Sequence, residues 1–329
     1  MSVYTALDQE TIAHYIDNFR IGPLTHFEGA LDGIENTTYF VSTDQSQQKS
    51  EDYTAEEGNF VLTLFETLRA EQLPFFIELT TYLQEHELPV PSPLRDINGN
   101  ALQTISNKPA LLFSRVAGEH PAHPNKEQCQ SIGSFLGKMH KLTSNNFDAP
   151  QNSRGFKWCC EQASQINEYL TATDNTLLND TIDHLKPFFV DAWSLPRGVI
   201  HGDLFHDNAL FLKNELIGVI DFYNASNEFL IFDLAITIND WCSGKDATLN
   251  HTLYTALLHG YQQERPLLDT EKAAWPHILQ AAALRFWISR LLVKHTPGQS
   301  QPKGILTQHK DPGEYKDILQ QRITNPAIL

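Results

Sequence analysis

The chain has 329 residues, enough for one large domain or for two lobes that share an interface. Its formal net charge of −16 gives no overall basic field, so nucleic acid is not an expected partner. No apolar run approaches the roughly 18 residues of a membrane span, and the four cysteines lack the CxxC spacing of zinc sites. Asp8 and Glu10 stand where a secretory signal needs cationic and then apolar residues. We therefore expect a cytoplasmic protein with no membrane association, whose oligomeric state the sequence leaves unknown.

The first part of the chain predicts a sheet-rich lobe. Thr5 to Asp8 resembles a capping box, and apolar residues follow it at helical spacing. Residues 36–42 and 59–65 are rich in β-branched and aromatic side chains and predict strands, separated by a polar loop over 44–58. Pro74 can open a helix that runs to about residue 86, and two more strands are expected near 101–105 and 110–116.

After Gly118 the pattern becomes mostly helical. Helices are expected over 125–142, 156–170, 176–193, 229–241, 248–263 and 270–293. A short strand at 199–200 and a hairpin of 209–212 with 216–220 interrupt them, and 296–304 is expected to be a loop. The prediction is an α+β fold with an antiparallel-sheet lobe over 1–117 and a mostly helical lobe over 118–329.

The run HGDLFHDN at 201–208, followed by VIDF at 219–222, carries the clearest chemical signal. Asp203 lies on the loop that leaves a short strand. Asn208 begins one arm of the predicted hairpin and Asp221 ends the other, so the two return to the same end. Two carboxylates and an amide oxygen then converge, and such oxygen ligands suit Mg²⁺. The alternative is an Asp/Asn-rich turn with a strand-end cap.

This run resembles the catalytic loop and metal-binding Asp of the protein-kinase-like phosphotransferases, with HGD in place of HRD. Aminoglycoside, choline and homoserine kinases share that variant. The resemblance implies a two-lobe kinase-like fold that uses ATP and Mg²⁺. It implies that Asp203 orients or deprotonates the substrate hydroxyl, and that Asn208 and Asp221 hold Mg²⁺ on the nucleotide phosphates.

The same resemblance makes the segment 27–41 the loop over the nucleotide phosphates. Gly29 and Gly33 permit close backbone approach, and Asn36 and Thr37 add small polar donors. A plain β-turn is the alternative reading of these residues.

The chain departs from the kinase pattern on the strand that follows the phosphate loop. The phosphate-binding lysine that this strand usually carries is replaced by Thr63. Glu78, on the next helix, would then lack its ion-pair partner, and we expect it at the surface. Either another cation reaches the phosphates or Mg²⁺ carries more of their charge.

The segments GIENTTYFV, VLTLFE, HGDLFHDNALF, FDLAITINDWC and LRFWISRL together resemble the kinase-fold homoserine kinases of bacterial threonine synthesis. That resemblance implies transfer of phosphate from ATP to L-homoserine, giving O-phospho-L-homoserine, and it makes the absent lysine expected. Another small-alcohol kinase of this fold, acting on an aminoglycoside, choline or a sugar-like alcohol, is the second reading. A nucleotide-binding scaffold without turnover is the third.

Homoserine needs opposite charges for its ammonium and carboxylate groups. Asp240 and Trp241 at the end of one predicted helix offer an acid and an apolar wall. Arg285 and Arg290 on a later helix offer a cation for the carboxylate. A spacing of five residues places these two arginines roughly 140° apart, so both do not face one pocket, and we select Arg285. The alternatives are structural salt bridges for the arginines and a core position for Trp241.

Overall fold

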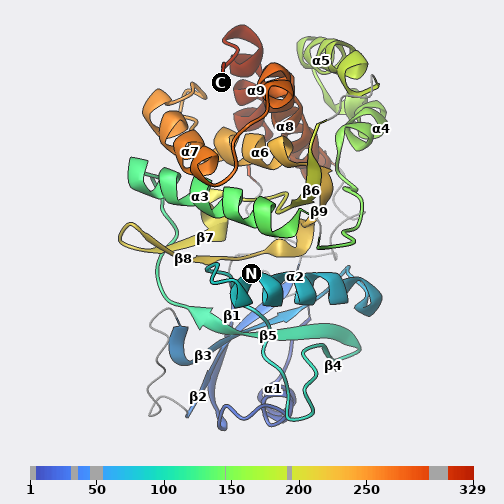
Figure 1. Ribbon diagram of the computed structural model, residues 1–329. Helices are drawn as coiled ribbons and strands as arrows, with labels where there is room; N and C mark the ends of the chain where they lie inside the picture. Colours follow the sequence, from blue (N-terminus) through green and yellow to red (C-terminus); the bar gives the residue numbers. More distant parts are fainter. Residues whose placement is uncertain (1–4, 31–35, 45–54, 145, 191–194, 296–309) are drawn as a thin grey trace. The chain divides into compact units, whose positions relative to one another are not determined.

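The computed structural model describes residues 5–30, 36–44, 55–144, 146–190, 195–295 and 310–329, which divide into two units (Figure 1). The first unit holds the described residues of Met1–His120 and of Ala209–Ile220. The second holds those of Pro121–Asn208, Asp221–Ser300 and His309–Leu329. Within these ranges no helix combines the length and the apolar character needed to cross a membrane.

The first unit is built on a five-stranded antiparallel sheet with the strand order β1-β2-β3-β5-β4. Its elements are α1 (Gln9–Ile16), β1 (Leu24–Gly29), β2 (Thr37–Thr43), β3 (Ala55–Leu64), α2 (Leu73–Glu85), β4 (Gln103–Ile105), β5 (Lys108–Val116), and the hairpin of β7 (Ala209–Leu212) with β8 (Glu215–Val219). The predicted strands and the helix after Pro74 are therefore present. The expected loop over 44–58 is wrong at its end, because β3 already begins at Ala55; residues 45–54 lie outside the described residues.

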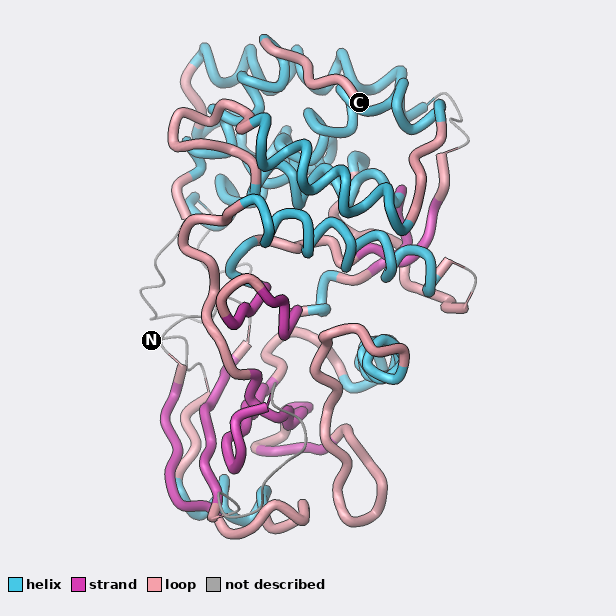
Figure 2. Tube along the Cα trace, turned by 60° about the vertical axis from the view of Figure 1, so that its left-hand side comes forward, coloured by secondary structure: helices cyan, strands magenta, loops and turns pink. Residues whose placement is uncertain are grey.

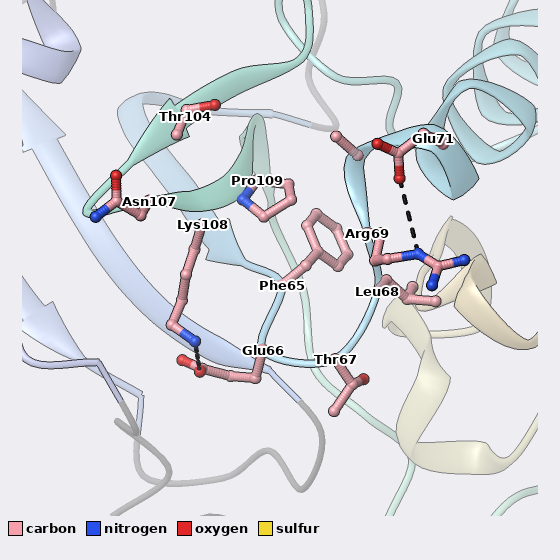
Figure 3. A pocket seen from close by; sticks show the side chains of 11 residues that line it. Phe65, Glu66, Thr67, Leu68, Arg69, Glu71, Thr104, Asn107, Lys108 and Pro109 are labelled. Carbon is pink, nitrogen blue, oxygen red and sulfur yellow. Dashed lines mark ion pairs between the residues drawn. The ribbon is translucent and has the colours of Figure 1, made fainter.

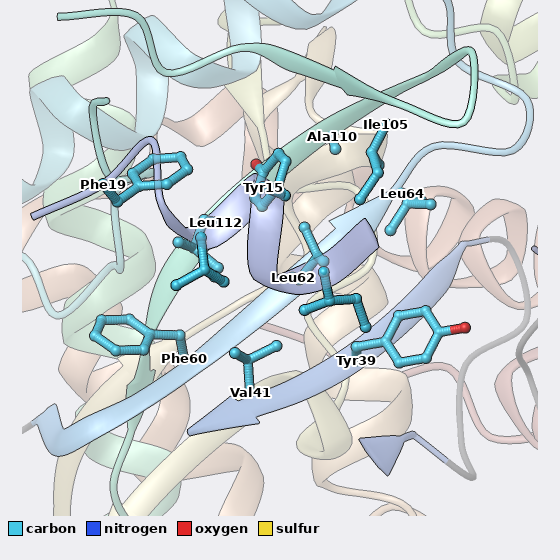
Figure 4. Packing of buried hydrophobic residues seen from close by; sticks show 12 residues of the cluster. Tyr15, Phe19, Tyr39, Val41, Phe60, Leu62, Leu64, Ile105, Ala110 and Leu112 are labelled. Atoms are coloured by element: carbon cyan, nitrogen blue, oxygen red, sulfur yellow. The ribbon is translucent and has the colours of Figure 1, made fainter. Parts of the chain in front are cut away.

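One face of this sheet carries the core of the first unit (Figure 4). Alternate side chains of neighbouring strands, such as Val41, Leu62 and Leu112, are almost fully buried there. Ile12 and Ile16 of α1 pack on the same face and are also buried. The period-two pattern of these strands follows from this burial, because successive strand residues point to opposite faces.

The hairpin β7–β8 joins the first unit although it lies about 90 residues further along the chain than β5. Glu119 and Phe211 exchange backbone hydrogen bonds of 3.0 and 2.9 Å. Gly118 has φ +104°, and a Cβ at this position would lie 2.7 Å from the Phe211 carbonyl oxygen. Only glycine permits this conformation together with so close an approach.

Helices make up most of the second unit (Figure 2). They are α3 (Lys126–Thr143), α4 (Phe156–Ile166), α5 (Ala172–Val190), α6 (Leu230–Trp241), α7 (His251–Glu264), α8 (Asp269–His295) and α9 (Pro312–Thr324), with the two-stranded ladder of β6 (Arg197–Ile200) and β9 (Ser226–Phe229). The six predicted helices are present, with ends that differ by a few residues. β9 and α9 were not predicted, and the loop expected at 296–304 lies outside the described residues.

Helices α3 and α7 approach each other closely through glycines. A Cβ at Gly133 would lie 2.0 Å from the backbone oxygen of Leu257, and one at Gly260 would lie 2.1 Å from that of Gln130. Such contacts leave no room for a side chain, so glycine sets the separation of the two helices. This packing places His140 of α3 against Tyr261 of α7.

A nearly buried carboxylate ties the start of the chain to the sheet. Glu66 accepts hydrogen bonds from the hydroxyls of Thr5 and Thr37, at 2.8 and 2.6 Å. Its carboxylate also pairs with the Lys108 ammonium at 2.6 Å, as Figure 3 shows. The capping box predicted at Thr5 is therefore wrong: Asp8 caps α1 by accepting the Thr11 N–H at 2.9 Å. Burial by itself would raise the pKa of Glu66, but these three donors hold it below its ordinary value.

We predict that Lys108→Met destabilises the protein in a pH-dependent way. At about pH 7 the free energy of unfolding should fall by about 1–2 kcal/mol, because Glu66 loses a charged donor. A lowered carboxylate pKa contributes stability above the ordinary carboxyl pKa, and that stability is lost as the pH falls through the lowered value. Urea unfolding of mutant and wild type should therefore differ less at about pH 4 than at about pH 7.

Lys272→Met is the matched control, because Lys272 pairs at 2.9 Å with an Asp269 carboxylate that is 99% exposed. This change should cost little at either pH. An equal loss at both pH values for Lys108→Met would contradict the role given to Glu66.

Candidate active site

The HGD run at 201–203 directly follows strand β6 in the second unit. Val199 and Ile200 are buried in the ladder with β9, and the chain turns immediately after them. Gly202 has φ +79°, and a Cβ there would lie 2.8 Å from the backbone oxygen of Asn224. Glycine is thus required at the turn that presents Asp203.

A buried carboxylate from α6 fixes this turn. Asp233 accepts the backbone N–H of His201 at 2.7 Å and that of Gly202 at 2.9 Å. The imidazole Nε2 of His140 lies 3.1 Å from the same carboxylate. Burial alone would raise the pKa of Asp233, but the hydrogen bonds and charges around it hold the pKa below its ordinary value. Burial also lowers the pKa of His140. The turn is therefore held by an ionised, fully hydrogen-bonded acceptor.

The network continues behind His140. Its Nδ1 lies 2.9 Å from the Tyr261 hydroxyl, which accepts from Arg265 at 3.1 Å. Arg265 in turn pairs with the buried Glu271 at 3.0 Å. Side chains from α3, α6, α7 and α8 are thereby linked to the loop. This network could not be predicted from the sequence, because its members lie far apart in the chain and form no local pattern.

The structure brings the three residues of the predicted centre into the second unit. The Asn208 amide donates from Nδ2 to the backbone oxygen of Asp203 at 2.8 Å. Asp221 follows β8 in a left-handed conformation, with φ +65° and ψ +56°. Burial raises the pKa of Asp203 to about 8; Arg285 and Lys310 oppose this rise, and the nearby Asp221 charge adds to it. Two carboxylates thus lie within electrostatic reach of each other.

The donor set fits a hard divalent cation. The Asn208 side chain donates a hydrogen bond from its nitrogen to the loop backbone. Among the described residues, none donates a hydrogen bond to its amide oxygen. Together with the carboxylates of Asp203 and Asp221 it offers oxygen ligands of the kind that Mg²⁺ takes beside phosphate oxygens. A cation between two carboxylates would also relieve their mutual repulsion.

Two residues predicted to contact substrate lie at the end of α6 and hold the loop. Asp240 accepts from the backbone N–H of His206 at 2.7 Å and from its imidazole at 2.7 Å. The hydrogen bond to Asp240 is the largest influence on the pKa of His206 and raises it. Trp241 is 1% exposed, and its indole N–H donates to the Leu204 carbonyl at 3.1 Å. These contacts make both side chains supports of the stretch between Asp203 and Asn208.

The two arginines of α8 differ in their surroundings. Arg285 is buried, and its Nη1 donates a hydrogen bond to the backbone oxygen of Gly202 at 2.5 Å. Its Nε is buried without a hydrogen-bond partner in the described part of the chain. Arg290 instead pairs with Glu314 at 2.6 Å and donates to the Asp311 backbone at 2.9 Å, which is a structural role.

The predicted nucleotide residues lie in the first unit. Gly29 ends β1, Asn36 precedes β2, and Thr37 begins β2 and bonds to Glu66; Gly33 lies outside the described residues. Thr63 is buried on β3, opposite Thr38 and Leu111. Glu78 of α2 is exposed, as expected. A pocket of about 380 Å³ in the same unit is lined by charged residues that include Arg69 and Lys108, but by none of the predicted site residues (Figure 3).

The chain is similar to known proteins along most of its length. A model of the phosphotransferase enzyme family matches residues 26–267. A homoserine kinase of Pseudomonas aeruginosa is 39% identical over 98% of this chain and 96% of its own length. One of Methylobacillus flagellatus is 38% identical over the same shares.

Among solved structures, an amicoumacin kinase in complex with AMP-PNP, Ca²⁺ and Ami superimposes with a TM-score of 0.68. It is 17% identical, and the match covers 96% of this chain and 92% of that one, so this likeness shows the fold. The predicted fold class, an antiparallel-sheet lobe and a mostly helical lobe of the kinase-like type, is confirmed.

We predict that Asp233→Asn weakens both the fold and turnover. The amide offers one oxygen where two backbone N–H groups need acceptors, and its NH₂ group faces a donor. An unsatisfied buried donor costs about 2 kcal/mol of unfolding free energy, and the loosened turn should lower kcat because Asp203 loses its fixed position. Chemical unfolding and steady-state kinetics at a temperature where the variant stays folded measure the two effects.

Asp269→Asn, at the 99% exposed start of α8, is the control and should change neither quantity. Wild-type stability and kcat in Asp233→Asn would show that the loop does not depend on this carboxylate.

Proposed function

This chain belongs to the phosphotransferase enzyme family, and from that premise we propose that it is an ATP-dependent kinase of L-homoserine. The product is O-phospho-L-homoserine, an intermediate for threonine synthesis. The observation that carries the proposal is the similarity to bacterial homoserine kinases along essentially the whole chain. The cluster of Asp203, Asn208 and Asp221 supports the same reaction.

Asp203 is the proposed acceptor for the substrate hydroxyl. The homoserine oxygen attacks the γ-phosphorus of ATP, the bond from that phosphorus to the bridging oxygen breaks, and ADP leaves. The hydroxyl proton passes to the Asp203 carboxylate as the new bond forms. Asp233 positions this step through the backbone of His201 and Gly202. Positioning and charge neutralisation do most of the work in such a transfer.

Asn208 and Asp221 are the proposed ligands of Mg²⁺. The ion, when bound, neutralises charge on the nucleotide phosphates. Gly29, Gly33, Asn36 and Thr37 are proposed to cover the phosphates from the first lobe, which we place at 1–117, with the catalytic and substrate lobe at 118–329. We propose that the enzyme works in the cytoplasm.

Arg285 is the proposed partner of the homoserine carboxylate. Its buried Nε lacks a hydrogen-bond partner within the described ranges, and its charge acts on Asp203. A carboxylate can satisfy this donor at little cost in ordering, because the guanidinium is already fixed on Gly202. We propose that Asp240 and Trp241 position the loop and do not contact the substrate.

An ADP-release assay with a panel of alcohols tests the proposed function. We expect turnover with L-homoserine and at least about a hundredfold lower kcat/KM with choline, an aminoglycoside and a sugar alcohol, since these lack the carboxylate. Asp203→Asn is the control variant. It should lower kcat by on the order of 10²-fold or more while nucleotide affinity stays near wild type. A higher kcat/KM with another alcohol would identify that alcohol as the substrate. Nucleotide binding without phosphoryl transfer to any alcohol would favour a nucleotide-binding scaffold without turnover.

A further prediction concerns the metal. Asp221→Ala should raise the Mg²⁺ concentration needed for half-maximal activity by about tenfold or more, because one charged ligand is lost. Mg²⁺ titrations of activity and of nucleotide binding measure this. An unchanged Mg²⁺ dependence would mean that Asp221 is not a ligand.

A further inference from the structure

The strand β3 (Ala55–Leu64) carries neither lysine nor arginine, and Thr63 stands where a kinase-like strand is expected to carry a phosphate-binding lysine. Phosphoryl transfer spreads negative charge over the oxygens of the γ-phosphoryl group. The carboxylate of Asp221, whose charge acts on the nearby Asp203, adds negative charge to the same place. A cation from another part of the chain would meet this need.

Two cations of the second unit act electrostatically on Asp203, namely Arg285 and Lys310. Arg285 is buried and fixed to the Gly202 backbone. Lys310 is different, because its side chain is 40% exposed and its ammonium pairs at 2.6 Å with Asp207, itself 44% exposed. Such a surface pair is weak in water, so an incoming phosphate can compete for the ammonium.

Two contacts place this ammonium on the loop. Lys310 Nζ lies 4.9 Å from the centroid of the Phe205 ring and 2.6 Å from Oδ2 of Asp207. Phe205 and Asp207 both belong to the stretch that joins Asp203 to Asn208. The ammonium therefore sits over the segment between the proposed hydroxyl acceptor and a proposed metal ligand.

The backbone beside Lys310 is anchored although its side chain is accessible. Asp311 caps α9 by accepting the Gly313 N–H at 3.0 Å, and its carbonyl accepts from Arg290 at 2.9 Å. The buried Tyr315 of α9 stacks on the Phe205 ring, with centroids 5.9 Å apart and ring planes at 10°. A fixed main chain with an accessible ammonium suits a group that must meet a ligand in a defined place.

We propose that Lys310 is a catalytic residue whose ammonium contacts the γ-phosphoryl group of ATP and supplies the cation that β3 lacks. The proposal rests on the proposed function as a kinase and assigns the group that neutralises the transferring phosphoryl. Lys310 transfers no proton and forms no covalent bond. Its ammonium donates a hydrogen bond to a γ-phosphate oxygen, in place of or in addition to its hydrogen bond to Asp207.

Isothermal titration calorimetry on the full chain, with Mg²⁺ and either AMP-PNP or ADP, tests this assignment. Lys310→Met should weaken AMP-PNP binding by about tenfold or more, since a charge-assisted hydrogen bond is lost. ADP affinity should stay within about twofold, because ADP has no γ-phosphoryl group. Lys310→Arg should restore AMP-PNP affinity to within about threefold of wild type, since the charge is kept. With homoserine, Lys310→Met should lower kcat by at least about tenfold with little change in the KM for homoserine.

Lys316→Met is the matched control. Lys316 lies on α9 and pairs with Asp174 of α5 at 3.3 Å, with a side chain that is 30% exposed. It should bind both nucleotides like wild type.

Three results would overturn the assignment. Unchanged AMP-PNP affinity would show that Lys310 does not reach the γ-phosphoryl group. Equal weakening of AMP-PNP and ADP together with a lower melting temperature would show a structural role. A rise in the KM for homoserine alone would place Lys310 on the substrate carboxylate. Because the nucleotide measurement needs no acceptor alcohol, the inference can fail while the chain remains a homoserine kinase, and it can hold if another alcohol proves to be the substrate.

Discussion

The hydrogen bonds from two consecutive backbone N–H groups, those of His201 and Gly202, to the carboxylate of Asp233 are the interaction on which the site depends. A buried carboxylate is tolerated only if its oxygens are well satisfied, and here His140 supplies a further partner. The position of His140 is set in turn by the close packing of α3 on α7, which glycines permit. The geometry of one loop thus follows from helix packing far away in the sequence.

The remaining contacts hold the loop at its other points. The end of α6 binds Leu204 and His206 through Trp241 and Asp240, and α8 binds Gly202 through Arg285. Two buried helices therefore support the whole stretch from the turn to Asn208. Rigid support of this kind favours a preorganised centre, in which substrate binding does not have to order the loop.

Much of this centre was predictable because its signal is local. Asp203 and Asn208 lie on one loop and Asp221 ends the adjoining hairpin, so spacing and strand pattern alone place them together. The roles of Asp240 and Trp241 were not predictable, since an acid and an aromatic at a helix end fit a substrate wall as well as a buried support. The contact of Asp233 with His140 spans 93 residues and leaves no local pattern. Strand β9 was not predictable because it is short and polar. Helix α9 was not predictable because it follows a segment rich in proline and glycine.

The most direct test of the account is a crystal structure of the full chain with a non-hydrolysable ATP analogue, Mg²⁺ and L-homoserine. If Asp203 accepts the substrate proton, the homoserine hydroxyl should lie within hydrogen-bond distance of the Asp203 carboxylate, roughly 2.6–3.2 Å. We also expect Asn208 and Asp221 to bind the metal ion, and the Arg285 guanidinium to bind the homoserine carboxylate. A homoserine molecule bound with its hydroxyl turned away from Asp203, or a metal ion held without Asp221, would contradict this account.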